Sequence, residues 1–517
     1  MTKIRNVIIS RNTLTCMLVF GFLLALVAVP DAYGEVYRVS GDVSGRWTSG
    51  DTYLVEGDIF VVADSALVIE PDVQVLFVGN HLFQVNGTLS AISGVEPGRT
   101  IEFAGVDGGD WAGIFFRSGG QDNSIVRDCI ISNAWVGIDI LGTSPIIFEN
   151  TIHAQTVGIN CENSRSDISD NTIVVGEGTS SQDLTGISLV NEANGLINDN
   201  HIRVNSNLFG ELIGIRIEES RPTIQDNYID VETVGEGYGI YSLTVTKLEL
   251  VRNIIRTSSP NRITNAFFFN STGVMLLNNT LHLMGNAESA WGLRIMENSE
   301  ILIINNIVLG NRYSFGIHSD EGTVVESSGY NDVWRHNTNY IGGYQGNEQI
   351  DISEDPLIVN ATPDAVSKDD YELLWYWDEA NQEEVRSPCI DSGSPNWSDP
   401  DDTYSDIGAV YFDHLVSIND PYKFMKENTA DNFELLNAYP NPFNSATHIK
   451  FYVSNSNHVN VSVLNNLGQS IEQLWGGHSG KGMHTLTWSP KYISSGSYFI
   501  RIENGGEIRF IKVSYLR

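Results

Sequence analysis

The chain has 517 residues, and its 30 lysines and arginines stand against 64 aspartates and glutamates, which gives a formal net charge of −34. Such acidity argues against nucleic acid and against anionic membrane surfaces as partners. It also disfavours unassisted binding of a polyanionic sugar. The length leaves room for more than one domain.

Residues 1–34 have the pattern of a secretory signal peptide. The basic residues Lys3, Arg5 and Arg11 precede an apolar run over residues 14–29, and a small-residue cleavage site follows. The run is short for a membrane span, so an anchor is the weaker interpretation. We therefore expect an exported chain with no stable transmembrane segment after cleavage.

Residues 35–110 read as short apolar strands separated by turns. A solenoid needs its first coil covered, so we expect this segment to form the N-terminal cap and the opening coils of the repeat that follows. The regular part begins near Trp111 and Gly113 and extends over residues 111–350.

Two short phrases recur through this regular part and share one period of 21 to 29 residues, which makes them a repeat. The first phrase is Asn-x-Ile or a close substitute, with Cys129 in the same slot one repeat earlier. Its copies begin at Asn150, Asn171, Asn200, Asn227, Asn253, Asn279, Asn306 and Asn331. The second phrase is Gly-Ile or a substitute. Its copies begin at Gly113, Gly137, Gly158, Gly186, Gly214, Gly239, Ala266, Gly292 and Gly316.

The arc from each glycine to the next asparagine is nearly constant at 13 to 15 residues, whereas the return arc varies from 8 to 15. The constant arc alternates apolar and polar residues and is rich in Ile and Val, which favours strands. We place the asparagine at a corner because asparagine tolerates left-handed backbone angles. Three strands per repeat predict one coil of a parallel β-solenoid, with an apolar interior and stacked asparagines bonding along the axis.

A leucine-rich repeat has an overlapping period, but it requires a Leu-x-x-Leu-x-Leu phrase and a helical return arc, and neither is present. Residues 40–350 resemble the right-handed parallel β-helix repeat proteins of the pectin-lyase-like superfamily. The resemblance implies the fold and no activity. The Asn-Thr-Asp, Gly-His-Gly and Arg-Ile-Lys phrases of polygalacturonase-like enzymes are absent from the repeat, so no catalytic residue is carried over.

Three cysteines remain after signal-peptide removal, which is too few for a disulfide framework in so large a chain. Cys129 and Cys161 occupy inward slots on different strand types. We therefore expect both to be buried thiols.

The strand after each Gly-Ile pair faces outward at alternate residues and is bordered by the variable loops. The first outward column contains Arg216, Tyr241, Phe268, Arg294 and His318, and Glu218 and Asp320 lie two residues further on. Aromatic faces beside arginines and carboxylates suit sugar rings and their hydroxyls, so these seven residues form our predicted ligand site. The plainer alternative is a solvated strand face.

Catalysis at this face is a second hypothesis. Glycoside hydrolysis needs two carboxyl groups about 5 to 9.5 Å apart. Glu162 and Glu218 lie two coils apart, which is marginal, and Val190 intervenes. We therefore expect a binding or structural surface, with polysaccharide as the candidate ligand and a lyase or hydrolase as the alternative.

The period fails after Asn331, and residues 351–414 are expected to form a C-terminal cap. Within it a short loop concentrates carboxylates whose oxygens suit Ca²⁺. The alternative is an acidic turn that caps itself. The predicted ligands are Asp399, Asp401, Asp402 and Asp406.

Residues 415–433 read as a linker, and residues 434–517 carry about seven short strands typical of a small β-sandwich. The segment resembles the type A sorting domain of the type IX secretion system. The resemblance rests on ordered motifs that include Pro440, Asn441, Pro442, Phe443, Gly468, Gly496, Tyr498 and Lys512. It implies a Gram-negative cell, an interaction with the secretion machinery and removal of the tail. An ordinary sandwich module is the alternative.

Overall fold

The computed structural model describes residues 34–515 apart from 94–98, 119–122, 177–182, 261–263, 271–272, 285–289, 297–298, 361–366, 379–380, 402, 415–433, 440–442, 444–445, 454–456, 466–469, 480–481, 491–492, 494–495 and 505–506. The predicted signal peptide and linker lie outside these residues, save Gly34. The chain divides into two compact units, Met1–Leu374 with Arg386–Tyr411 and Trp375–Val385 with Phe412–Arg517, called here the solenoid unit and the C-terminal unit.

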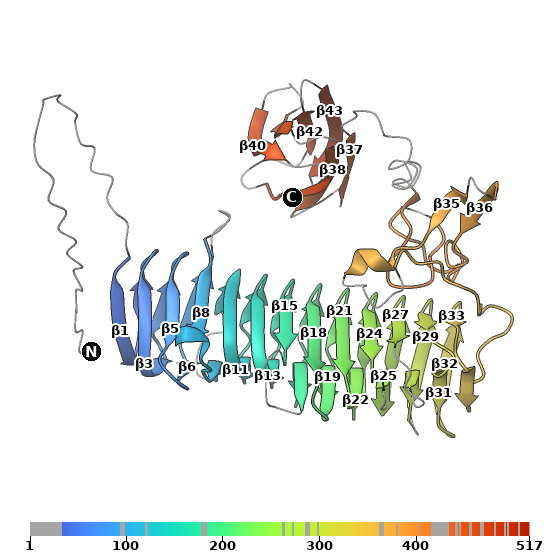
Figure 1. Cartoon of the computed structure of the whole chain (residues 1–517), viewed down its shortest axis with the longest axis horizontal. Helices are drawn as coiled ribbons and strands as arrows, with labels where there is room; N and C mark the ends of the chain where they lie inside the picture. The colour runs from blue at the N-terminus through green and yellow to red at the C-terminus, as the bar shows by residue number, and fades with distance from the viewer. Residues whose placement is uncertain are drawn as a thin grey trace, which may run out of the picture. The chain divides into compact units, whose positions relative to one another are not determined.

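The solenoid unit is a stack of parallel coils, each built from up to three strands, and Figure 1 shows the stack from the side. From β13 on, strands of the first kind follow the asparagine corner, and the earlier ones occupy the same place in their coils. They are β1 (Val36–Asp42), β3 (Thr52–Val61), β5 (Gln74–Phe77), β8 (Ile101–Gly105), β11 (Cys129–Leu141), β13 (Thr151–Glu162), β15 (Thr172–Val175), β18 (His201–Ser206), β21 (Tyr228–Thr233), β24 (Ile254–Ser258), β27 (Thr280–Met284), β30 (Ile307–Leu309) and β33 (Asp332–Trp334).

Strands of the second kind carry the Gly-Ile phrase. They are β6 (Leu82–Val85), β9 (Gly113–Arg117), β16 (Leu184–Val190), β19 (Glu211–Glu218), β22 (Glu236–Leu243), β25 (Thr264–Asn270), β28 (Ala290–Ile295), β31 (Phe315–Ser319) and β34 (Thr338–Gly342). The strands β1, β3, β11 and β13 run through both kinds, so the described strands of both kinds join into one 22-stranded sheet.

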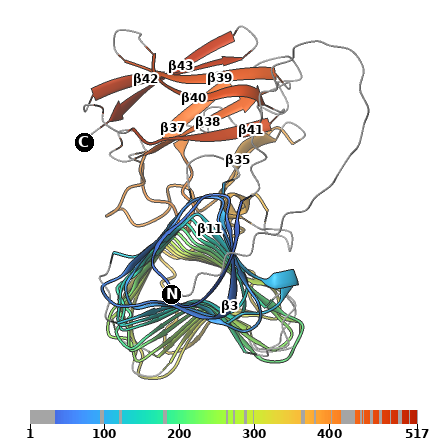
Figure 2. The ribbon, with the colours of Figure 1, turned by 90° about the vertical axis from the view of Figure 1, so that its left-hand side faces the viewer.

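Strands of the third kind form a separate sheet, 12-stranded over the described residues. They are β2 (Gly45–Trp47), β4 (Ala66–Ile69), β7 (Thr88–Ile92), β10 (Ile125–Arg127), β12 (Ile146–Phe148), β14 (Asp167–Ser169), β17 (Leu196–Asn198), β20 (Thr223–Gln225), β23 (Leu248–Val251), β26 (Val274–Leu277), β29 (Glu300–Ile304) and β32 (Val324–Gly329). A view along the stack superposes the coils around one interior (Figure 2). The predicted all-β parallel solenoid is confirmed.

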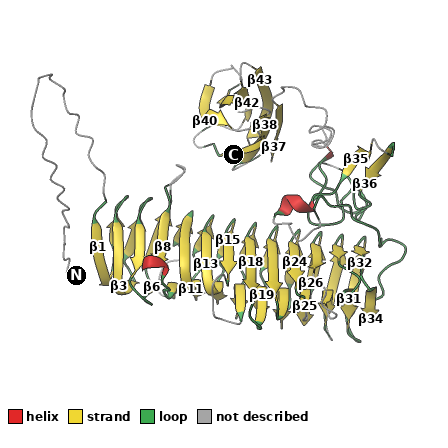
Figure 3. Ribbon diagram, in the orientation of Figure 1, coloured by secondary structure: helices red, strands yellow, loops and turns green. Residues whose placement is uncertain are grey.

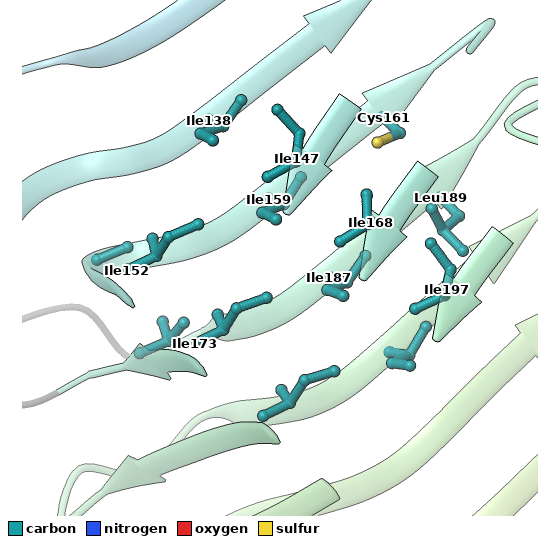
Figure 4. Close-up of a cluster of buried hydrophobic side chains, with 14 of the residues drawn as sticks. Ile138, Ile147, Ile152, Ile159, Cys161, Ile168, Ile173, Ile187, Leu189 and Ile197 are labelled. Carbon is teal, nitrogen blue, oxygen red and sulfur yellow. The ribbon is translucent and has the colours of Figure 1, made fainter. Parts of the chain in front are cut away.

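The interior is filled by columns of branched side chains that repeat from coil to coil. Ile152 and Ile173 occupy one column, and Ile159 and Ile187 another, as Figure 4 shows. Ile202 continues the first column, and all five side chains are fully buried. Burying each such side chain contributes about 1.5–3 kcal/mol. One coil alone cannot bury its column, so stability comes from stacking. Cys129 and Cys161 are buried free thiols, as predicted, and Cys389 is also buried.

The corner differs in one detail from the sequence-based expectation. The left-handed residue is the one before each ladder asparagine, as at Asp170 (φ 57°), Asp199 (φ 52°) and Asp226 (φ 58°). The turn made there points the asparagine side chain inward, where it is buried, as at Asn171. Placing the asparagine itself at the left-handed position was therefore wrong by one residue.

The described residues of 351–374 and 386–411, which belong to the solenoid unit, close the asparagine ladder and then return along the outside of the stack. Asp351 Oδ1 accepts the backbone N–H of Asn331 at 3.0 Å, which continues the ladder by one step. The 3₁₀ turn η2 (Lys368–Tyr371) lies several coils back, where Lys368 Nζ meets Asp199 Oδ1 at 2.6 Å (Figure 3). The described parts of residues 351–374 and 386–411 thus contact the side of the stack as well as its last coil.

A buried polar cluster lies under this segment. Tyr371 Oη is 2.9 Å from His282 Nδ1, and Arg256 forms an ion pair with Asp230 at 3.1 Å. Burial lowers the pKa of His282 to about 3 and raises that of Tyr371, so both are neutral at pH 7.

A second short helix among the described residues, η1, spans Val106–Gly108.

The C-terminal unit contains a β-sandwich over its described residues. One sheet has three strands, β37 (Glu434–Tyr439), β38 (Thr447–Val453) and β41 (Gly482–Trp488). The other has four strands, β39 (Asn457–Leu464), β40 (Ser470–Ser479), β42 (Gly496–Asn504) and β43 (Glu507–Tyr515). Both sheets contribute to one core that contains Phe443 and Trp488, and the predicted sandwich is confirmed (Figure 2). A separate pair of strands, β35 (Trp375–Asp378) and β36 (Glu383–Arg386), completes the described elements.

No helix among the described residues is long and apolar enough to cross a membrane.

Candidate functional site

The first outward column is aligned as the repeat predicts. Strand pairing places Arg216 beside Tyr241, Tyr241 beside Phe268, Phe268 beside Arg294 and Arg294 beside His318. These five residues lie on β19, β22, β25, β28 and β31, and each step is one strand spacing of about 4.8 Å. The side chain of Phe268 lies outside the described part of the chain.

Arg216 is the centre of a first cluster on this face. Its Nη2 atom contacts Glu218 Oε1 at 2.6 Å, and its guanidinium lies 5.8 Å from the ring centre of Tyr241. A second carboxylate, Glu211 Oε1, lies 3.8 Å from Nη1. Tyr238 packs edge-on against Tyr241 at 5.1 Å. A planar cation, two rings and two carboxylates therefore share one partly exposed patch, called here the Arg216 cluster.

A second cluster of similar composition lies further along the stack. Arg294 lies 5.0 Å from the ring centre of Trp291, and Trp291 stacks on Phe315 at 5.9 Å. His318 Nδ1 lies 3.8 Å from Asp320 Oδ1. Burial, more than the nearby Arg294, lowers the pKa of His318, although Asp320 opposes the shift, so the imidazole is neutral at pH 7. We call this group the Trp291 cluster.

The sequence argument missed two aromatic residues of these clusters, Tyr238 and Trp291. Each lies three residues before a predicted outward residue, and strict alternation would turn it inward. Alternation breaks at the intervening glycine, because that glycine has no register partner while the residues on either side do. The signal available was the Gly itself, since an isolated Gly within a strand marks a bulge or a close backbone approach.

Glu211 and Glu236 were also missed, and they are register partners on adjacent coils. Burial raises the pKa of Glu211, Arg216 opposes that shift, and the charge of Glu236 adds to it. Tyr238 Oη donates to Glu236 Oε2 at 3.3 Å. By contrast, Glu162 is engaged elsewhere, where it accepts Nδ2 of Asn191 at 2.9 Å.

The acidic loop of the C-terminal segment directs its carboxylates toward its own donors. Asp399 Oδ2 accepts the backbone N–H of Asp406 at 2.8 Å, and Asp406 Oδ1 accepts that of Asp391 at 2.6 Å. Asp401 Oδ1 accepts the Thr403 hydroxyl at 2.7 Å. Asp402 lies outside the described residues, and those that are described contain no group of three or more metal-ligating side chains. Calcium binding stays a prediction, and the hydrogen bonds support the self-capping turn.

The sorting motif is only partly visible. Phe443 is buried in the sandwich core, and Gly496 and Tyr498 lie on β42. Lys512 lies on β43. The remaining predicted positions fall outside the described residues, namely Pro440, Asn441, Pro442 and Gly468.

Two protein families match the chain. Residues 112–266 match the family described as right handed beta helix region, and residues 437–513 match the secretion system C-terminal sorting domain. A search of the curated proteins finds no match.

Two solved structures also match the chain. Full-length tailspike protein 2 from a bacteriophage of Escherichia coli O157:H7 matches with 10% identity and a TM-score of 0.25 over 91% of this chain and 64% of that one. The enzymatically active domain of a bacteriophage tailspike protein 2 matches with 9% identity and a TM-score of 0.23 over 92% and 71%. This chain thus spans less than two thirds of the full-length tailspike.

Proposed function

We propose that this chain, which carries a right-handed β-helix and a sorting domain that implies export by the type IX secretion system, binds a neutral polysaccharide outside the cell. The sorting domain implies a secreted or cell-surface protein that interacts with the type IX machinery. The proposal adds a Gram-negative cell, a cleaved signal peptide and a glycan ligand held on the face of β19 to β31.

The observation that carries the proposal is the pair of arginine-over-aromatic contacts, Arg216 with Tyr241 and Arg294 with Trp291. Aromatic rings offer apolar faces, and guanidinium and carboxylate groups offer directional hydrogen bonds to hydroxyls. Arg216 and Arg294 are three coils apart, about 14 Å at one strand spacing per coil. A ligand that contacts both clusters is therefore an extended chain.

Charge supports a neutral ligand over an anionic one. Arg216 is compensated by Glu218 at 2.6 Å and faces Glu211 as well. The net charge of −34 repels polyanions at long range. A neutral glycan needs no compensating cation, and its hydroxyls can bond to both members of an ion pair.

The test is a glycan array probed with the full mature chain, with Tyr241→Ala and Trp291→Ala as variants. We expect binding to neutral glycans that falls about tenfold in each variant, which corresponds to about 1.4 kcal/mol. Trp135→Ala is the control, because Trp135 is an exposed tryptophan on β11, distant in the stack from both clusters. Equal binding by all four proteins would reject this face as the site, and absence of any glycan binding would leave a structural role.

A second candidate is glycan hydrolysis at the Arg216 cluster. It is favoured by Glu211 and Glu218, which contact the same guanidinium, and by the raised pKa of Glu211, since an acid and a base of differing pKa are what the reaction requires. Product release from a bound glycan, abolished in Glu211→Gln and retained in Glu300→Gln, would establish it. Binding with no product would exclude it.

A further inference from the structure

A groove separate from the strand face lies in the later part of the solenoid unit, remote in sequence from β19 to β31. Its volume is about 660 Å³. It lies entirely within Arg386–Tyr411, the later part of the solenoid unit. The side chains that define it are Arg386, Asp391, Asn396, Trp397, Thr403 and Tyr404.

Two large aromatic side chains are presented to solvent at this groove. Tyr404 is 63% exposed and Trp397 is 38% exposed, although their neighbours Ser405, Asp406 and Asp399 are buried. Leaving aromatic surface in water forfeits the stabilisation that its burial would give. Exposed tryptophan and tyrosine side chains are typical anchors of binding sites, because each combines a rigid apolar face with a polar tip.

The two aromatics lie on opposite sides of a hairpin whose described residues are joined by backbone hydrogen bonds. Ser398 and Tyr404 form an antiparallel bridge, and the N–H of Asp399 donates to the carbonyl of Thr403 at 3.2 Å. The N–H of Ser405 donates to the carbonyl of Trp397 at 3.3 Å. Two of the carboxylates predicted to bind Ca²⁺ accept N–H groups of this loop, Asp399 from Asp406 and Asp401 from Thr403.

The hairpin is also attached to the stacked coils. Asn305 Oδ1 accepts the N–H of Ser394 at 2.8 Å, and its Nδ2 donates to Ser405 Oγ at 3.0 Å. Asn278 Nδ2 donates to the carbonyl of Asp406 at 2.8 Å. Both asparagines belong to the corner column of the solenoid. Because these hydrogen bonds already order the residues around the groove, little conformational entropy is lost when a ligand binds.

The polar side of the groove is nearly neutral in charge. Arg386 forms an ion pair with Asp391 and also donates to the carbonyl of Ile390 at 3.3 Å. Asn396 adds an exposed amide that both donates and accepts. A compensated ion pair offers hydrogen bonds to hydroxyl groups while giving no net attraction for an anion.

We propose that this groove is a second carbohydrate site, which binds a short neutral oligosaccharide with sugar rings against Trp397 and Tyr404 and hydroxyls bonded to Arg386, Asp391 and Asn396. The aromatic anchors, the neutral polar side and the acidic chain together favour a neutral glycan over an anionic one. This inference does not depend on the strand face, because no residue is shared between the two sites.

The experiment isolates the groove by working in the full mature chain carrying Tyr241→Ala and Trp291→Ala, which disables the strand face. Isothermal titration with neutral cello-, xylo-, manno- and laminari-oligosaccharides should still give binding to at least one series. Adding Trp397→Ala or Tyr404→Ala should weaken that binding tenfold or more, whereas adding Trp135→Ala should leave it unchanged. Tyr404→Phe should keep most of the affinity, which separates a stacking role from loss of folding.

Three results would overturn the proposal. One is the absence of binding to every neutral series in the Tyr241→Ala, Trp291→Ala protein. Another is residual binding that survives Trp397→Ala and Tyr404→Ala together. The third is a preference for acidic oligosaccharides or for peptides over all the neutral series. The first result leaves the strand-face proposal standing if the protein without these substitutions binds glycans.

Discussion

Asn227 donates its side-chain amide to Oδ1 of Asn253 at 2.9 Å, and the same oxygen accepts the backbone N–H of Asn227 at 3.1 Å. The Asn227 amide also donates to the carbonyls of Ile197 and Gln225. Its own Oδ1 accepts hydrogen bonds from the backbone N–H and from the side-chain amide of Asn200. One buried side chain therefore satisfies polar groups of three coils.

Replacing Asn227 by alanine should destabilise the solenoid by about 3 kcal/mol or more. The substitution leaves buried donors of Asn200 and buried carbonyls without partners, and each unsatisfied group costs about 1–3 kcal/mol. Urea unfolding of the full chain measures the change in free energy. Asn337→Ala is the matched control, because Asn337 is exposed, and it should change stability by less than about 0.5 kcal/mol. Equal effects of the two changes would contradict the ladder as a stabilising element.

Gly214→Ala should destabilise the chain for a different reason, which is the close approach of β19 to the next coil. A Cβ atom there would lie 2.3 Å from Ile229 Cγ2 and 2.5 Å from the carbonyl oxygen of Gly239. The backbone of the next coil cannot move aside without breaking strand pairing. The free energy of unfolding should therefore fall by at least the roughly 1–3 kcal/mol typical of overpacking. Thermal unfolding reports it. Gly343→Ala, whose Cβ would meet nothing nearer than 3.5 Å, should be nearly neutral; a loss as large as that of Gly214→Ala would argue against the steric explanation.

Asp332 should make stability fall as pH rises. It is buried, it accepts the Cys389 thiol at 3.4 Å, and burial raises its pKa from 3.8 to about 7. The folded state therefore holds a proton that the unfolded state releases near pH 4. The resulting stabilisation is complete below about pH 4 and is lost as pH rises through about 7, at roughly 1.4 kcal/mol per pKa unit.

Urea unfolding at pH 5 and pH 8 tests this linkage. Asp332→Asn, which stays neutral at both values, should lose less stability between them than the unaltered chain does. An identical loss in both proteins would show that Asp332 is not the responsible group. The pKa of His282 is shifted in the opposite direction, from 6.5 to about 3. Its contribution to stability is therefore lost as the pH falls from about 6.5 towards 3.

The architecture could be predicted because it is periodic. The spacing of Gly214 and Asn227 fixed which residues stack, and the register of Arg216 with Tyr241 followed from counting alone. Alternation failed where the backbone bends, so Tyr238 and Trp291 were missed. The corner was misplaced by one residue because both Asp226 and Asn227 tolerate turn conformations.

The course of the described residues of 351–374 and 386–411 could not be predicted, since it depends on contacts without any period. Lys368 meets Asp199 across 169 residues of sequence, and Tyr371 meets His282 across 89. A local pattern contains no information about such pairs. The groove at Trp397 could not be predicted for the same reason. Whether an aromatic side chain is exposed depends on its tertiary contacts, which the local sequence does not encode.

The asparagine ladder has a direction, and this direction governs how such a chain can grow. Each ladder asparagine donates one amide hydrogen to its C-terminal neighbour, from Asn150 to Asn331. Asp351 receives the last of them, and a carboxylate has no hydrogen to pass on. A coil duplicated between these points finds a donor on one side and an acceptor on the other. A coil appended after Asp351 does not, so at this end the ladder can be lengthened only by coils inserted before Asp351.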